Sequence, residues 1–140
     1  MFKSYIAGFL DADGSIALSK KTSKHPWQRS PEVSFYNADK NILETISKKY
    51  GGKVKVRTFA NENHNISYEL RITSGQTLKL LEDVFPYMLH GKKKKRAELI
   101  LKYYKECTPR NGKYTSELIK KKEWLNEQVQ GIQMRGLGAY

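Results

Sequence analysis

The sequence predicts one α+β domain in which helices and antiparallel strands follow the order αββαββα, with additional helices at the C-terminal end. Two observations support this fold class. Apolar residues recur at helical spacing in five segments, and four short segments alternate apolar with polar residues, as half-buried strands do. The chain has 140 residues, which is enough for one domain with its own core, and it contains no internal repeat.

The first elements are a helix over residues 3–12 and a hairpin. Apolar and polar residues alternate around Ile16 and again around Val33, so we expect two strands that each have one buried face. Residues 22–31 between them are mostly polar and hold two prolines, which predicts a long hairpin loop.

A second helix and a second hairpin come next. Asp39 is expected to cap the helix, because its carboxylate can accept hydrogen bonds from free amides of the first turn, and Gly51 is expected to end it. Alternation around Val54 and Leu70 predicts two further strands joined by an asparagine-rich loop.

Three more helices are expected to complete the domain: one opens at Ser74, one follows Lys93, and the last is capped by Ser116. We assign residues 1–130 to this single domain. Residues 131–140 hold three glycines and are expected to form a flexible C-terminal tail.

The composition favours a polyanionic partner. Lysine and arginine number 26 against 14 acidic residues, a formal net charge of +12, and such an excess attracts nucleic acid. No run of about eighteen apolar residues could cross a membrane, and two carboxylates interrupt the first helix, which excludes a secretory signal. The single cysteine fits a reducing compartment. We expect a cytoplasmic or otherwise intracellular protein, in a nucleoid or an organelle, that is neither secreted nor bound to a membrane.

Residues 6–14, IAGFLDADG, carry the most specific signal. Ser4, Gly8 and Ala12 lie four residues apart on one stripe of the first helix, and small residues in such a stripe let a second helix approach closely. At the helix end, the carboxylate of Asp13 and the free carbonyl of Ala12 are hard oxygen ligands that suit Mg²⁺. The segment therefore predicts a metal site beside a helix–helix contact.

This segment has two other interpretations. An EF-hand calcium loop also begins with alternating carboxylates, but the glycine comes too early here and Thr22 stands where the twelfth-position glutamate belongs. An ordinary core helix that ends at an Asp–Gly turn is the second alternative.

One face of the predicted sheet is polar and basic. Side chains alternate along a strand, so residues out of phase with the apolar positions share the face that points away from the core. Such a face is either simply solvated or suited to contact DNA bases and phosphates, and the net charge favours DNA. The residues expected to contact DNA, including Arg29 near the tip of the first hairpin, are Ser19, Lys21, Arg29, Ser34, Tyr36, Lys53, Lys55, Arg57, Glu69 and Arg71.

IAGFLDADG resembles the signature of the LAGLIDADG homing endonucleases, with which it shares six of nine letters. Residues 86–101, PYMLHGKKKKRAELIL, resemble a later lysine-containing segment of the same family, and the likeness spans about residues 2–129. It implies the αββαββα fold of single-motif members, which act as homodimers. The dimer contact would then run along the first helix, through Ser4, Gly8, Asp11 and Ala12.

The resemblance also implies catalytic residues. Asp13 matches the family's metal ligand, so the expected cofactor is Mg²⁺, with Mn²⁺ as an alternative and no small-molecule cofactor. Lys93, four residues before Ala97, matches the active-site lysine, with Lys92 and Lys94 as alternatives.

A polar active-site residue is implied shortly after the second strand. Counting along the chain places it at Asp39, with Asn37 as the alternative, but the chain has no glutamine at this place. The role of Asp39 as a helix cap explains the residue equally well.

These inferences combine into a hypothesis: a homodimeric, metal-dependent endonuclease that cuts double-stranded DNA at a long pseudo-palindromic site. Two rival functions use the same fold. One is an RNA maturase that has lost cleavage, and the other is a regulator that binds DNA without cutting it.

Overall fold

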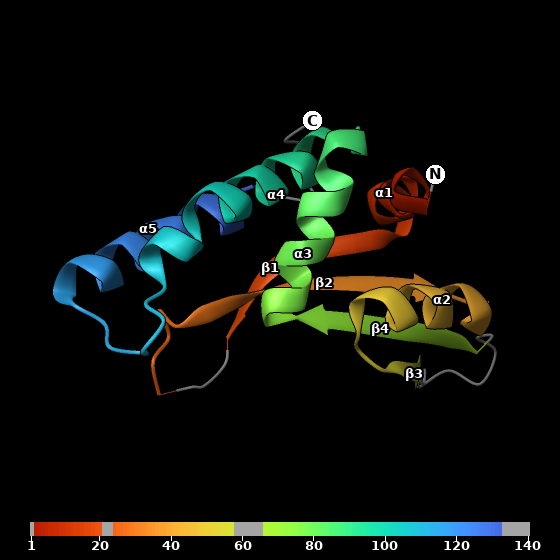
Figure 1. The fold of residues 1–140 in the computed structure, drawn as a ribbon, viewed down its shortest axis with the longest axis horizontal. Coiled ribbons are helices and arrows are strands. Elements are labelled where there is room, and N and C mark those ends of the chain that lie inside the picture. Colours follow the sequence, from red (N-terminus) through yellow and green to blue (C-terminus); the bar gives the residue numbers. More distant parts are fainter. Residues whose placement is uncertain (1, 21–23, 58–65, 133–140) are drawn as a thin grey trace.

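The computed structural model describes residues 2–20, 24–57 and 66–132. These residues form an antiparallel sheet with helices laid over one of its faces (Figure 1). The predicted α+β order is confirmed. The elements are α1 (Phe2–Asp13), β1 (Gly14–Lys20), β2 (Arg29–Asn37), α2 (Lys40–Tyr50), β3 (Val54–Arg57), β4 (Ser67–Thr73), α3 (Ser74–Val84), the 3-10 turn η1 (Phe85–Tyr87), α4 (Gly91–Tyr103), the 3-10 turn η2 (Lys105–Cys107) and α5 (Ser116–Gln130).

The two predicted hairpins join into one four-stranded sheet. Its strand order is β1–β2–β4–β3, so the second strand of each hairpin lies at the centre. In register, Phe35 of β2 stands between Gly14 and Leu70, and Val54 follows on β3. This row faces the helices, and the residues one position away face the opposite, open side of the sheet.

The core lies between the sheet and the helices. Because helical and strand periodicities place apolar side chains on facing surfaces, each element buries one side. Burying one such large side chain stabilises the fold by about 1.5–3 kcal/mol. The buried apolar residues of the sheet and of α1 are Ile6, Ala7, Leu10, Ile16, Leu18, Val33, Phe35, Leu70 and Ile72.

The predicted loop of the first hairpin is too long at its C-terminal end. Strand β2 begins at Arg29, and Pro31 is a buried strand residue that pairs with Leu18. A proline is tolerated here because the pairing of β2 with β4 begins only at Glu32, so Pro31 has a neighbouring strand on one side alone.

The predicted start of α2 is confirmed, whereas the predicted start of α4 and the predicted cap of α5 differ from the structure. Asp39 caps α2 as predicted, accepting a hydrogen bond from the Asn41 amide at 2.9 Å. Helix α4 begins at Gly91 instead of after Lys93. Helix α5 is capped by Thr115 instead of Ser116.

The C-terminal end of α5 is tied back to the core. The Arg96 guanidinium of α4 donates one hydrogen bond to the Ile16 carbonyl and another to the Ile132 carbonyl, each at 2.7 Å. The rest of the predicted flexible tail lies outside the described residues, as does Lys21. In the part of the chain that the structure describes, no helix has the length and apolar character needed to cross a membrane.

Candidate active site and nucleic-acid interface

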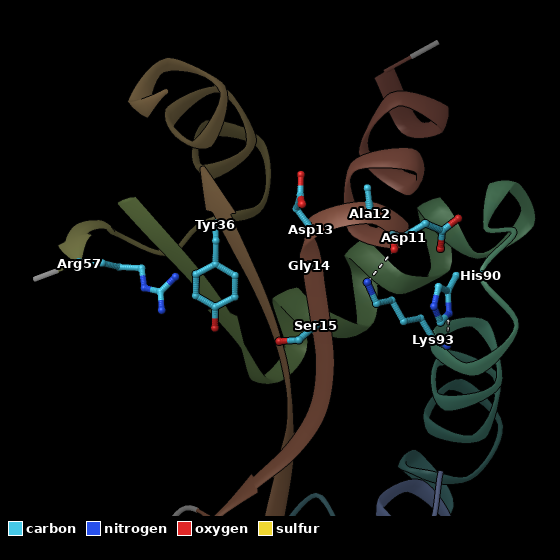
Figure 2. Close-up of a pocket in the computed structure, with 9 residues that line it drawn as sticks. All are labelled: Asp11, Ala12, Asp13, Gly14, Ser15, Tyr36, Arg57, His90 and Lys93. Carbon is cyan, nitrogen blue, oxygen red and sulfur yellow. Dashed lines mark hydrogen bonds between the residues drawn. The ribbon is translucent and has the colours of Figure 1, made fainter. Parts of the chain in front are cut away.

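Helix α1 ends at a pocket of about 700 Å³. The end of α1 and the start of β1 lie at its centre, the start of α4 on one side and the sheet on the other (Figure 2). The pocket therefore brings together Ala12, Asp13 and Lys93, which lie far apart in the sequence and were predicted to belong to one site. The lining residues are Asp11, Ala12, Asp13, Gly14, Ser15, Tyr36, Arg57, His90 and Lys93.

The carboxylate of Asp13 is accessible. Its side chain is exposed and points away from Lys93 (Figure 2). Ala12 beside it is also exposed, at the end of the helix where backbone carbonyls lack helical partners. These hard oxygen donors fit a divalent cation such as Mg²⁺. Nowhere in the described ranges do three or more His, Cys, Asp or Glu side chains gather into a metal-binding group.

Lys93 is buried at the wall of the pocket. Its ammonium donates hydrogen bonds to the carbonyl of Asp11 at 2.7 Å and to that of Leu10 at 3.1 Å, which joins α4 to the last turn of α1. Burial lowers the pKa of Lys93, and the carboxylates of Asp11 and Asp13 oppose that shift. The cation is thus held by carbonyl oxygens in a partly desolvated place.

The two alternative lysines do not line the pocket. The ammonium of Lys94 lies 5.0 Å from the centre of the Phe85 ring, on another side of α4. Lys92 is likewise absent from the lining. The geometry favours Lys93 as the active-site lysine.

Asp11 differs from Asp13 although the two residues are adjacent in the motif. Its Oδ2 accepts a hydrogen bond from the Leu89 amide at 2.7 Å, which fixes the segment before α4 against α1. Its Oδ1 is buried and has no hydrogen-bond partner among the described residues. Asp11 therefore joins the end of α1 to the segment that precedes α4.

Asp39 lies at the start of α2 and is not part of the pocket lining. Its cap hydrogen bond accounts for the residue, and its position gives no support to the predicted catalytic role. Asn37 accepts a hydrogen bond from the Asp39 amide at 2.7 Å and borders a hollow on α1. The polar groups that the sheet contributes to the pocket are instead Ser15, Tyr36 and Arg57, and the Arg57 guanidinium lies 4.5 Å from the centre of the Tyr36 ring.

The outer face of α1 is uncovered. Ser4, Gly8 and Ala12 are all exposed, and a Cβ added at Gly8 would meet no atom within 4 Å. Tyr5 beside them is 57% exposed. Asp13 borders the hollow on this face as well as the pocket, so it stands where the two surfaces meet.

The open face of the sheet carries a cluster of charged side chains. Lys53, Lys55, Glu69 and Arg71 surround a shallow hollow on it. Arg71 is held by two carboxylates, in a hydrogen bond to Glu69 and in an ion pair with Glu32 at 3.4 Å. Ser34 lies on the same face by register, although it is buried.

Glu32 was missed by the sequence analysis. It accepts a hydrogen bond from Ser19 and pairs with Arg71, so it joins β1 to β4 across the open face. Its contacts could not be predicted, because the predicted loop reached Pro31. The start of β2, and therefore the register of β2 with its neighbouring strands, remained undefined.

Arg29 is not at the hairpin tip, as predicted, but within β2 on the helix-covered side. It shares the phase of Val33, and its guanidinium donates to the Leu18 carbonyl at 3.1 Å. It borders a hollow against α5 together with Asn126 and Glu127. The error has the same source as the misplaced start of β2.

Together, the fold and the site define a basic αββαββα protein with polar groups gathered at the end of its first helix. The family model described as LAGLIDADG endonuclease matches residues 6–115. The match covers most of the sequence, and the chain belongs to this family. The comparison with curated proteins found no match.

The fold is similar to those of several solved homing endonucleases. A crystal structure of I-CvuI in complex with its target in the presence of calcium has a TM-score of 0.71 and 22% identity, covering 96% of this chain and 83% of that one. I-Vdi141I, an archaeal intron-encoded homing endonuclease complexed with DNA, has a TM-score of 0.61 and 16% identity, covering 99% and 88%. I-SmaMI, bound to an uncleaved DNA target with calcium ions, has a TM-score of 0.66 and 22% identity, covering 92% of this chain but 45% of that one.

Proposed function

We propose that the protein is a site-specific endonuclease that cuts double-stranded DNA as a homodimer and requires a divalent cation. The observation that carries this proposal is the place of Asp13. It lies at the meeting point of the pocket that holds Lys93 and the uncovered small-residue face of α1.

The homodimer would form through the outer face of α1. Small exposed residues at Ser4 and Gly8 leave room for a second helix at close distance, and Tyr5 would lose its exposure there. A symmetric contact brings the same residues together twice, so the two copies of Asp13 would approach one another at the axis. In this arrangement, the second copy would add oxygen ligands for the divalent cation that a single copy does not supply. The coverage of less than half of I-SmaMI is in line with two copies of this chain doing the work of one longer chain.

DNA would bind along the open face of the sheet. Its exposed lysines and arginines can neutralise phosphates, and Glu69 and Arg71 can form hydrogen bonds with base edges. The solved relatives I-CvuI and I-Vdi141I were crystallised with DNA, which supports the same partner class here. An enzyme of this kind acts inside the cell, in a nucleoid or an organelle.

In the proposed reaction, the Asp13 carboxylate and the Ala12 carbonyl would hold Mg²⁺, with Mn²⁺ as an alternative. The bound cation supplies activation of water and stabilisation of the leaving oxygen. Lys93 places a positive charge at the pocket wall, where it can stabilise negative charge on the attacked phosphate. The carbonyls of Leu10 and Asp11 hold that charge in position before DNA binds, so little reorganisation is needed.

A plasmid library that carries randomised sites tests this function. Incubation with Mg²⁺ should linearise a minority of plasmids, and sequencing of the cut ends should give one pseudo-palindromic consensus. Binding without cutting would instead favour the DNA-binding regulator. Selective binding of structured RNA without DNA cleavage would favour the maturase.

A further inference from the structure

Helix α4 has an unusual cap. The Nδ1 atom of His90 accepts a hydrogen bond from the backbone amide of Lys93 at 3.2 Å, and the imidazole lines the pocket (Figure 2). Side-chain caps are normally hydroxyl, carboxamide or carboxylate oxygens, which do not gain a proton near neutral pH. An imidazole cap can do so.

This cap works only while Nδ1 carries no proton. In that state the remaining proton sits on Nε2 and the ring is neutral. Protonation of Nδ1 would remove the acceptor and add a positive charge at the positive end of the helix dipole. The first turn of α4 already carries Lys92, Lys93 and Lys94 and has no acidic residue, so a further charge is poorly tolerated there.

The capped turn is the one that places the proposed catalytic lysine. Lys93 is held at both ends, by His90 at its backbone amide and by the Leu10 and Asp11 carbonyls at its ammonium. The preceding segment is anchored by the hydrogen bond from the Leu89 amide to the Asp11 carboxylate. If the first turn frays, the backbone of Lys93 moves and its ammonium loses this fixed position.

We propose that His90 is a positioning residue, whose neutral imidazole caps α4 and thereby holds Lys93 in place for DNA cleavage. The inference rests on the proposed function and adds a residue to it. Because the imidazole is tied to the backbone amide of Lys93, cleavage should depend on a hydrogen-bond acceptor at position 90.

Single-turnover cleavage at saturating protein and neutral pH tests the proposal with two variants of His90. His90→Ala removes the cap and should slow cleavage about fivefold or more. His90→Asn supplies a side-chain acceptor of the usual kind for a helix cap, so it should restore most of the lost rate. DNA affinity in Ca²⁺ should stay within about threefold in both variants, because the DNA contacts lie mainly on the sheet.

Thr115→Ala is the matched control. Thr115 caps α5 by accepting a hydrogen bond of the same length, 3.2 Å, from the Leu118 amide. Its loss should lower the melting temperature but leave the rate of cleavage unchanged. Full cleavage by His90→Ala, or cleavage by His90→Asn that is as slow as that by His90→Ala, would overturn the proposal.

A second measurement decides the matter even if the parent protein cuts no DNA, an outcome that would refute the proposed function separately. The protection factor of the Lys93 amide against hydrogen exchange should be lower in His90→Ala than in the parent protein and should be largely restored in His90→Asn. Equal protection in the parent protein and in His90→Ala would refute the positioning role.

Discussion

At the scale of single residues, Lys93 shows how burial and the proposed function oppose one another. Burial of an ammonium favours its neutral form, and this lowers the pKa of Lys93. Carbonyl oxygens and nearby carboxylates recover part of the cost, and the charge is kept where a phosphate can meet it. A lysine on the surface would be more stable as a cation but less preorganised for catalysis.

The lowered pKa of Lys93 predicts a pH dependence of stability. Between that lowered value and the ordinary value of 10.5, the unfolded chain binds the Lys93 proton more tightly than the folded chain does. The free energy of unfolding should therefore rise with pH in this window, relative to a Lys93→Met variant that has no proton to lose. Denaturant titrations of both proteins at several pH values between about 8 and 10.5 measure this difference. A free energy of unfolding of the parent protein that falls with rising pH, relative to that of Lys93→Met, would contradict the assigned environment of Lys93.

At the scale of elements, much of the fold was predictable because each element has a local cause. Alternation predicted all four strands, and the carboxylate of Asp39 and the glycine at Gly51 fixed both ends of α2. The start of α4 was missed because histidine is not among the usual caps. The start of β2 was missed because proline normally marks a loop, and only the stagger of β4 makes Pro31 acceptable in a strand.

The uncovered stripe of α1 predicts how the chain associates. Gly8→Leu should leave the monomer fold intact, because nothing lies within 4 Å of the added Cβ. It should weaken the dimer, since overpacking costs about 1–3 kcal/mol and a symmetric contact contains the change twice. Sedimentation at micromolar concentration should show a dimer for the parent protein and monomer for the variant.

Gly75→Leu is the control for this experiment. Gly75 is also exposed and has no atom within 4 Å of an added Cβ, but it lies on α3. A dimer that survives Gly8→Leu with unchanged affinity would show that α1 is not the interface.

At the scale of the whole molecule, one sheet separates two environments. Its helix-covered face holds the core, and its open face collects Lys55, Glu69 and Arg71. The sequence could predict the pocket residues Asp13 and Lys93, because a motif marks each of them. It could not predict that Arg29 faces the helices, since that depends on where a strand begins and on the layer that covers it.

The open face makes a prediction about DNA binding. Arg71→Ala should lower affinity and either relax the preference at one site position or reduce the salt dependence by about one ion. Lys102→Ala removes the same charge from the exposed side of α4 and serves as the control. Gel-shift titrations at several salt concentrations should separate the two variants. Equal effects from both would mean that net charge, rather than the open face, governs binding.

The central claim is that Asp13 serves cleavage and not DNA binding. Asp13→Asn keeps the shape of the side chain but removes one anionic ligand from each copy, and Asp11→Asn is the neighbouring control. The most direct measurement compares gel-shift affinity in Ca²⁺ with cleavage in Mg²⁺ for both variants. We expect Asp13→Asn to bind DNA about as well as the parent protein, because the proposed DNA contacts lie mainly on the sheet, and to lose cleavage by orders of magnitude. Asp11→Asn should lose less. Near-normal cutting by Asp13→Asn would contradict this account of the site.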